Sequence, residues 1–115
     1  TTFDFIADKF TEVSKKYSDI RCELAGKMNP LHVPKDSFLV KTLCKIYNDV
    51  TNSNAEPIAI GGATYARAFD NFVSFGANLP GQKDMCHQTD EFISIDNLLL
   101  AYEIYCRAIR KLLIM

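Results

Sequence analysis

Hydrophobic positions recur with a helical period in three segments of the chain. Apolar side chains follow steps of three and four residues between Thr2 and Tyr17, again after Ser37, and again after Ser94. Such steps keep one face of a helix apolar, and serine often caps helix N-termini. The sequence therefore predicts helices over residues 2–17, from 37 to about 51, and from 94 onward. The apolar stripes comprise Phe3, Ile6, Phe10, Val13 and Tyr17; Leu39, Leu43, Ile46, Tyr47 and Val50; and Leu98, Tyr102, Tyr105, Ile109 and Leu112.

The third helix has the strongest pattern of the three. Leu99, Cys106 and Leu113 widen its apolar face, so we expect neighbouring structure to cover it on more than one side. Arg110 and Lys111 fall in its last turn, where cations suit the negative end of the helix macrodipole. These two charges are interpreted as structural.

Alternation and short apolar runs predict three strands. Residues 19–24 alternate Ile20, Cys22 and Leu24 with charged side chains, as a half-buried strand requires. Residues 57–60 form an apolar run that stops at two glycines, residues 65–70 allow a short helix, and residues 73–80 form another apolar run. The predicted fold class is therefore α+β with an α/β-type core piece, in the order helix, strand, helix, strand, short helix, strand, long helix.

The stretch from residue 27 to residue 37 is the best candidate for a linker. It carries Pro30 and Pro34 together with Asn29 and Asp36, residue types that interrupt regular pairing. We therefore place a domain boundary here, with one unit over residues 1–33 and a second over residues 34–115.

Composition limits the classes of partner and compartment. The 115 residues are 48% hydrophobic and carry 13 Lys plus Arg against 14 Asp plus Glu, for a formal net charge of −1. This balance excludes a disordered tail and gives no reason to expect binding to nucleic acid or to an anionic membrane. No apolar stretch approaches the roughly 20 residues of a membrane-spanning helix. The four cysteines lack metal-finger spacing and the chain opens without a secretory leader, so we expect reduced thiols and a cytoplasmic location.

His87 is the first candidate for chemistry. It lies in the polar segment before the third helix, between Asp84 on one side and Asp90 and Glu91 on the other. Imidazole nitrogen binds Zn²⁺ well, and nearby carboxylates can orient the ring or share the metal. The alternative is a solvated histidine in an acidic loop. His32, in the linker, is interpreted as an exposed or packing residue.

The turn at Gly61, Gly62 and Thr64 is the second candidate. Glycines after a short apolar run let backbone N–H groups converge on an anion, and the alternative is a turn that needs positive φ. A nucleotide-binding loop is excluded because no Lys follows the glycines. Cys86 is interpreted as a plain thiol, because neighbours in an extended segment point to opposite sides.

Three segments in order, PLHVPKDSFLVKTLCKIYNDVT, AEPIAIGGATYARAF and LPGQKDMCHQTDEFISIDNLLLAYEIY, resemble the C-terminal part of peptidase V-like dipeptidases, also known as Xaa-His dipeptidases. These enzymes belong to the clan of di-zinc aminoacylases and glutamate carboxypeptidases. The resemblance implies that His87 binds one of two catalytic zinc ions and that Gly61, Gly62 and Thr64 help to hold the carboxylate end of a dipeptide substrate. Ala63 departs from the family's third glycine, which leaves the conformation of that turn open.

The same resemblance implies that residues 1–33 end a lid domain and that residues 34–115 form the C-terminal portion of the catalytic domain. The family's HxD motif and Glu-Glu pair, which supply the other zinc ligands and the general base, have no match here. We therefore expect no catalytic residue in this segment, no activity of the isolated chain, and self-association of a fragment with exposed apolar faces. Two alternatives remain: a stand-alone binding or assembly module without catalysis, separable by the length of the gene, and a weaker one, a phosphate-binding domain using the Gly61–Gly62 turn.

Overall fold

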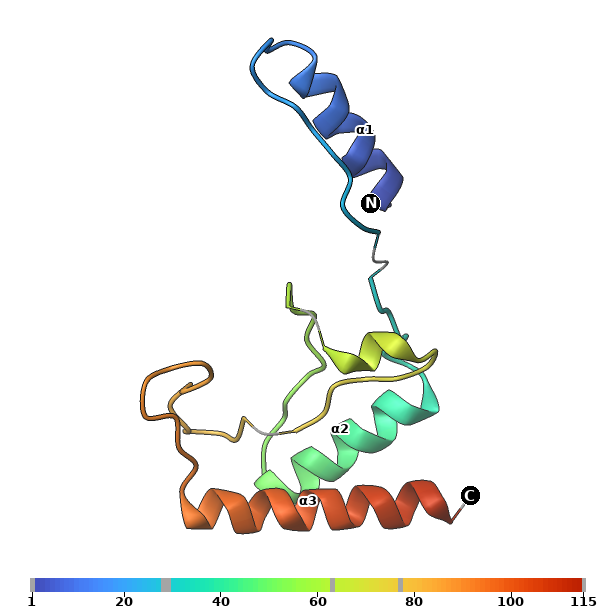
Figure 1. The fold of residues 1–115 in the computed structure, drawn as a ribbon. Coiled ribbons are helices and arrows are strands. Elements are labelled where there is room, and N and C mark those ends of the chain that lie inside the picture. The colour runs from blue at the N-terminus through green and yellow to red at the C-terminus, as the bar shows by residue number, and fades with distance from the viewer. Residues whose placement is uncertain (1, 28–29, 63, 77, 115) are drawn as a thin grey trace. The chain divides into compact units, whose positions relative to one another are not determined.

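The computed structural model describes residues 2–27, 30–62, 64–76 and 78–114. Within these residues the chain forms α1 (Phe3–Ser14), α2 (Phe38–Thr51), the short 3-10 helix η1 (Tyr65–Ala68) and α3 (Ile95–Leu113) (Figure 1). The chain divides into two compact units, Thr1–Leu31 and His32–Met115. The assignment of residues 1–33 to a lid domain and of residues 34–115 to a catalytic domain stays a prediction.

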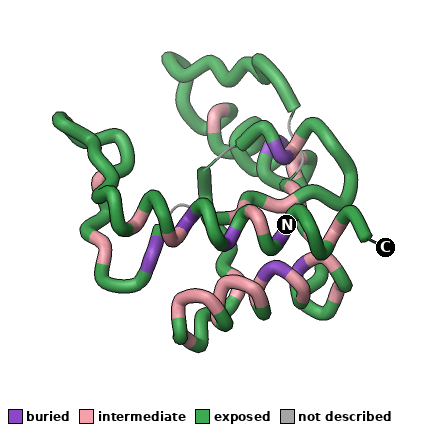
Figure 2. Tube along the Cα trace, turned by 90° about the horizontal axis from the view of Figure 1, so that it is seen from below, coloured by how far each residue is buried: buried purple, intermediate pink, exposed green. Residues whose placement is uncertain are grey.

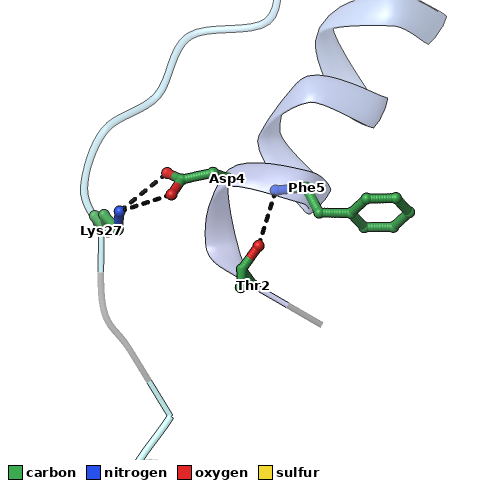
Figure 3. A network of polar contacts seen from close by, with 4 residues as sticks. All are labelled: Thr2, Asp4, Phe5 and Lys27. Carbon is green, nitrogen blue, oxygen red and sulfur yellow. Dashed lines mark hydrogen bonds and ion pairs between the residues drawn. The ribbon is translucent and has the colours of Figure 1, made fainter.

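The first unit consists of α1 and the segment that returns beside it. Thr2 caps the helix, because its Oγ1 accepts from the Phe5 backbone N–H at 3.4 Å. Figure 3 shows how Lys27 closes the unit, with its Nζ donating to the two carboxylate oxygens of Asp4 at 2.9 and 3.1 Å. The Lys27 ammonium also lies 5.7 Å from the centroid of the Phe3 ring. The return segment is therefore held at the N-terminal turn of α1.

Two asparagines end α2. Asn52 adopts a left-handed backbone with φ 48°, and its N–H donates to the Asn48 carbonyl oxygen. The Asn48 side chain reaches forward, with Oδ1 accepting from the Ala55 N–H at 2.7 Å and from the Ser53 Oγ at 3.0 Å. Its Nδ2 donates to the Ala55 carbonyl oxygen at 3.0 Å. The predicted start of this helix is also confirmed, since the Ser37 Oγ accepts from the Val40 N–H.

The core of the second unit lies between α2 and α3, which pack against each other. Val40 and Leu43 are buried on α2, and Ala101, Ile104 and Ala108 are buried on α3 at spacings of three and four residues. Ile104 is only 1% exposed. The two alanines lie on either side of it on the same face of α3. Figure 2 shows these buried positions as short stretches in a trace that is mostly exposed.

The buried face of α3 is not the one that its large side chains predict. Tyr102 is 68% exposed, and Leu98 and Ile109 are also exposed. The expected cover on more than one side is not found among the described residues. Periodicity located the helix but not its packed face, because an apolar pattern weighted by large residues underrates alanines that fit a helix–helix contact.

The predicted α+β fold class is wrong, because the described residues contain helices and no strand. Residues 19–24, 57–60 and the described part of 73–80 have no regular secondary structure, apart from turns at residues 19 and 80. Alternation shows which side chains could share a face, but a strand also needs a neighbour to pair with its backbone. No two segments pair in this way across the described ranges, and residues 19–24 are exposed throughout.

Two tyrosines hold the segment that leads to the candidate site. The Tyr47 hydroxyl donates to the Asn78 carbonyl oxygen at 2.9 Å, and the Tyr105 hydroxyl donates to the Phe75 carbonyl oxygen at 3.3 Å. Between them Gly76 has φ +97° and lies directly against the Tyr105 ring. Burial raises the pKa of Tyr47 further above its ordinary value. α2 and α3 therefore jointly fix the backbone that precedes the His87 loop.

Hydropathy adds one observation about the helices. None of those in the described part of the chain is long and apolar enough to cross a membrane.

Candidate functional site

The His87 loop, residues 80–93, connects the segment held by the two tyrosines to the start of α3. It opens with a turn in which the Gln82 N–H donates to the carbonyl oxygen of buried Leu79 at 3.1 Å. The Asn97 side chain in the first turn of α3 donates to the Gln82 Oε1 at 3.3 Å. Ser94 then caps α3, accepting from the Asn97 N–H at 3.2 Å. Both ends of the loop are therefore attached to the helical core.

His87 lies in the most exposed part of this loop. Its backbone is left-handed, with φ 60°, and its N–H donates to the Glu91 Oε2 at 3.2 Å. Asp90, one residue before Glu91, is also left-handed, with φ 59°. The expected hydrogen bond between a nearby carboxylate and the imidazole ring is not found among the described residues, where Glu91 binds the backbone of His87 instead.

The backbone of Cys86 is held in the loop by the carboxylate of Asp84. Asp84 Oδ1 accepts from the Cys86 N–H at 3.1 Å, the local turn that aspartate commonly forms two residues ahead. Hydrogen bonding to Asp84, and the negative charge of that group, raise the pKa of the Cys86 thiol. The thiolate is the form that binds metals, so this shift disfavours Cys86 as a ligand. All four cysteines are free thiols in the structure.

A shallow hollow of about 260 Å³ lies beside the loop. Its wall combines polar side chains with apolar ones. Its lining residues are Asn78, Gln82, Met85, Cys86, Glu91, Phe92 and Ile93. The hollow therefore shares Glu91 with the bond that holds the His87 backbone.

The described residues do not by themselves form a complete metal site. No group of three or more His, Cys, Asp or Glu side chains comes together in the described part of the chain. Zinc sites in proteins use three or four protein ligands in a tetrahedral arrangement. Exposed His87 in a loop attached at both ends fits a single imidazole ligand. It does not fit a site formed by these residues alone.

The Gly61–Gly62 segment differs from the predicted turn. Among the described glycines only Gly76 and Gly81 have positive φ, so the turn interpretation that required it at Gly61 or Gly62 is wrong. A Cβ at Gly61 would meet nothing within 4 Å, and one at Gly62 would lie 3.8 Å from Ile60 Cδ1. Ala63, where the family pattern has a third glycine, lies outside the described residues.

Thr64 is the part of this segment with defined chemistry. Its Oγ1 accepts from the Ala66 N–H at 3.1 Å and from the Ser74 Oγ at 3.1 Å. The first bond caps η1, so the predicted short helix after Thr64 is confirmed. Because both contacts use the oxygen as acceptor, the hydroxyl proton remains able to bind an anion. Between described residues of the two segments, no hydrogen bond links Thr64 to the His87 loop.

Comparison with known proteins gives a consistent family match. Residues 8–111 match the peptidase family M20/M25/M40. "Putative dipeptidase YtjP" of Bacillus subtilis is 47% identical over 83 residues, which cover 72% of this chain and 18% of that protein. "Putative dipeptidase SH1171" of Staphylococcus haemolyticus is 37% identical over 110 residues, covering 96% of this chain and 23% of that protein. The chain thus spans about a fifth of the length of these curated relatives. No solved structure matches it.

Proposed function

The chain belongs to the peptidase family M20/M25/M40, and from this we propose that it is the C-terminal part of a zinc-dependent dipeptidase that hydrolyses dipeptides with a two-metal-activated water. The observation that carries the proposal is the family match over residues 8–111. Two relatives whose names call them dipeptidases support the substrate class. The proposal places the working enzyme in the cytoplasm.

His87 is the residue that we assign to metal binding. It is exposed, it lies in a loop attached to the core at both ends, and a bond to Glu91 holds its backbone. A neutral imidazole in such a place can donate a lone pair to zinc without breaking a packed contact. The other ligands and the general base are assigned to parts of the complete enzyme outside the described residues.

Metal ions in such a site would polarise the scissile carbonyl and lower the pKa of bound water. Within the described residues no group of three or more His, Cys, Asp or Glu side chains that could hold a metal ion forms. The isolated 115-residue chain is therefore inactive under this proposal, because peptide hydrolysis also needs a positioned base to move the proton.

Gly61, Gly62 and Thr64 are assigned to the carboxylate end of the substrate. The Thr64 hydroxyl accepts two hydrogen bonds through its oxygen and can donate its own proton to a carboxylate. The exposed backbone at Gly61 and Gly62 leaves room for a ligand to approach, because a Cβ at Gly61 would meet no atom within 4 Å. The segment orients the substrate and takes no part in proton transfer.

The metal assignment is tested by His87→Ala in the complete polypeptide that contains this chain. The variant should lose about one zinc ion per polypeptide and its dipeptidase activity, while circular dichroism shows an unchanged fold. His32→Ala is the matched control, since His32 is the other histidine of the chain and is also exposed. It should keep both metal and activity. Full zinc content and turnover in His87→Ala would refute the assignment.

The substrate assignment is tested separately by Thr64→Val, which removes the hydroxyl with little change in volume. We expect a higher KM for dipeptides with little change in kcat, since binding of the substrate carboxylate is present in ground state and transition state alike. Thr64→Ser should restore KM. Ser74→Ala removes a partner of Thr64 but keeps its hydroxyl, so it should leave KM unchanged. An unaltered KM in Thr64→Val would overturn this role.

A further inference from the structure

We propose that Glu91 is a positioning residue, whose carboxylate holds the backbone of His87 and thereby fixes the direction in which the imidazole leaves the loop. This inference rests on the proposed role of His87 as a metal ligand. It assigns to Glu91 a contact with the protein backbone and none with the metal or the substrate.

The first reason is that packing does not fix this part of the loop. All residues from Cys86 to Ser94 are exposed. A side chain that is buried on several sides has its backbone held by its neighbours, and these residues lack that support. Hydrogen bonds are then the contacts left to define the backbone. A backbone turn bond from the Gln88 N–H to the Met85 carbonyl oxygen at 3.1 Å spans His87, and the His87 N–H itself donates to the Glu91 Oε2 at 3.2 Å.

The second reason is the backbone conformation that the bond closes. The bond between His87 and Glu91 closes a turn over residues 87–91. His87, its first residue, and Asp90, its fourth, are both left-handed, with φ 60° and 59°. Residues other than glycine disfavour this conformation, so a free loop would leave it. A charged acceptor makes a stronger bond to an N–H than a neutral one. The Glu91 carboxylate therefore adds to the Gln88–Met85 backbone bond in stabilising a left-handed conformation at His87 that a residue with a Cβ disfavours.

The third reason is that the loop contains a second carboxylate bond of the same kind with a different target. Asp84 Oδ1 accepts from the Cys86 N–H at 3.1 Å. Asp84 thus holds the residue before His87, while Glu91 holds His87 itself. Both groups are exposed carboxylates of the same loop that bind a backbone N–H, and they hold different residues.

The test uses the complete polypeptide and measures zinc affinity by competition with a chelator. Glu91→Ala should weaken one zinc site by about 10-fold to 100-fold, the usual effect of losing a group that orients a ligand. Glu91→Gln should restore most of the affinity, because its amide oxygen can accept the same N–H. Asp90→Asn removes a neighbouring negative charge, keeps a residue that tolerates the left-handed backbone, and should leave the affinity unchanged.

A spectroscopic readout separates positioning from a general loss of stability. In the Co²⁺-substituted protein, Glu91→Ala should change the visible absorption bands of the site, because these bands respond to ligand geometry. Asp90→Asn and Asp84→Ala should leave the bands unchanged. If Glu91→Ala has the same absorption bands and the same zinc affinity as Asp90→Asn, the proposal is overturned. A loss of zinc affinity in Glu91→Gln as large as in Glu91→Ala would also overturn it. The Glu91 carboxylate would then act as a metal ligand or through its negative charge.

The outcome for His87→Ala distinguishes this inference from the proposed function. If that variant keeps both zinc ions, the metal assignment fails and the positioning role fails with it. If His87→Ala loses an ion while Glu91→Ala binds zinc like the unaltered protein, only the positioning role is refuted.

Discussion

Replacing Gly76 by alanine should destabilise the second unit through two separable effects. Gly76 has φ +97°, a conformation that residues with a Cβ rarely adopt. A Cβ at this position would also lie 2.7 Å from Tyr105 Cζ and 2.9 Å from its Cε1. The ring would have to move, and its hydroxyl would then lose the carbonyl oxygen of Phe75, which it now contacts at 3.3 Å.

The magnitude follows from the contacts that are lost. The backbone strain costs about 1–2 kcal/mol. The hydrogen bond of Tyr105 contributes about 1 kcal/mol. The edge-on contact of its ring with Phe75, with centroids 6.1 Å apart, contributes about 0.5 kcal/mol more. Gly76→Ala should therefore lower the free energy of unfolding by about 3 kcal/mol, measured by urea unfolding with far-ultraviolet circular dichroism.

Gly81 supplies the matched control. It also has positive φ, +76°, but a Cβ there would meet nothing within 4 Å. Gly81→Ala should therefore cost only the backbone strain, about 1–2 kcal/mol. In a Tyr105→Ala background the extra cost of Gly76→Ala should disappear, since no ring remains to be displaced. Equal losses for Gly76→Ala and Gly81→Ala in the unaltered background would refute the steric argument.

Further predictions concern the core, the end of α2 and the loop thiol. Ile104→Ala should cost about 2–5 kcal/mol in urea unfolding because Ile104 is 1% exposed, whereas Leu113→Ala, at a position 78% exposed, should change stability by less than about 0.5 kcal/mol. Asn48→Ala should cost about 1–3 kcal/mol in the same assay, since it removes the bonds that hold the chain after α2. Asp84→Asn should lower the pKa of Cys86 and so increase its thiolate fraction near neutral pH. Faster alkylation of Cys86, followed by peptide mass spectrometry over a pH series, checks this sign; an unchanged rate contradicts it.

The helices were predicted well from sequence because their signals are local. Ser37 and Ser94 cap α2 and α3 as predicted, and α1 begins one residue after its predicted start, at Phe3, but ends at Ser14, three residues before its predicted end. A cap and a period of three to four residues depend on neighbours within one or two turns, so the sequence contains the necessary information. The three predicted strands failed for the opposite reason, because pairing depends on a segment elsewhere in the chain.

The candidate site shows the same division. The sequence identified His87 and its neighbouring carboxylates as a group, from their residue types and their place before a helix. It did not show that Glu91 accepts from the His87 N–H or that Asp84 accepts from the Cys86 N–H. Those bonds depend on two left-handed residues in the loop, His87 and Asp90, which neither periodicity nor composition reports.

The amino-acid sequence by itself determined where the helices begin, which polar loop carries the imidazole, and which family motifs are present. Only the tertiary structure decided which face of α3 is buried, where Ala101 and Ala108 take the place of the larger predicted residues. It also decided how Tyr47 and Tyr105 fix the backbone ahead of the His87 loop. The reason is that a helix forms from contacts within one segment, whereas a buried face and a fixed loop require the shape of a second segment packed against the first.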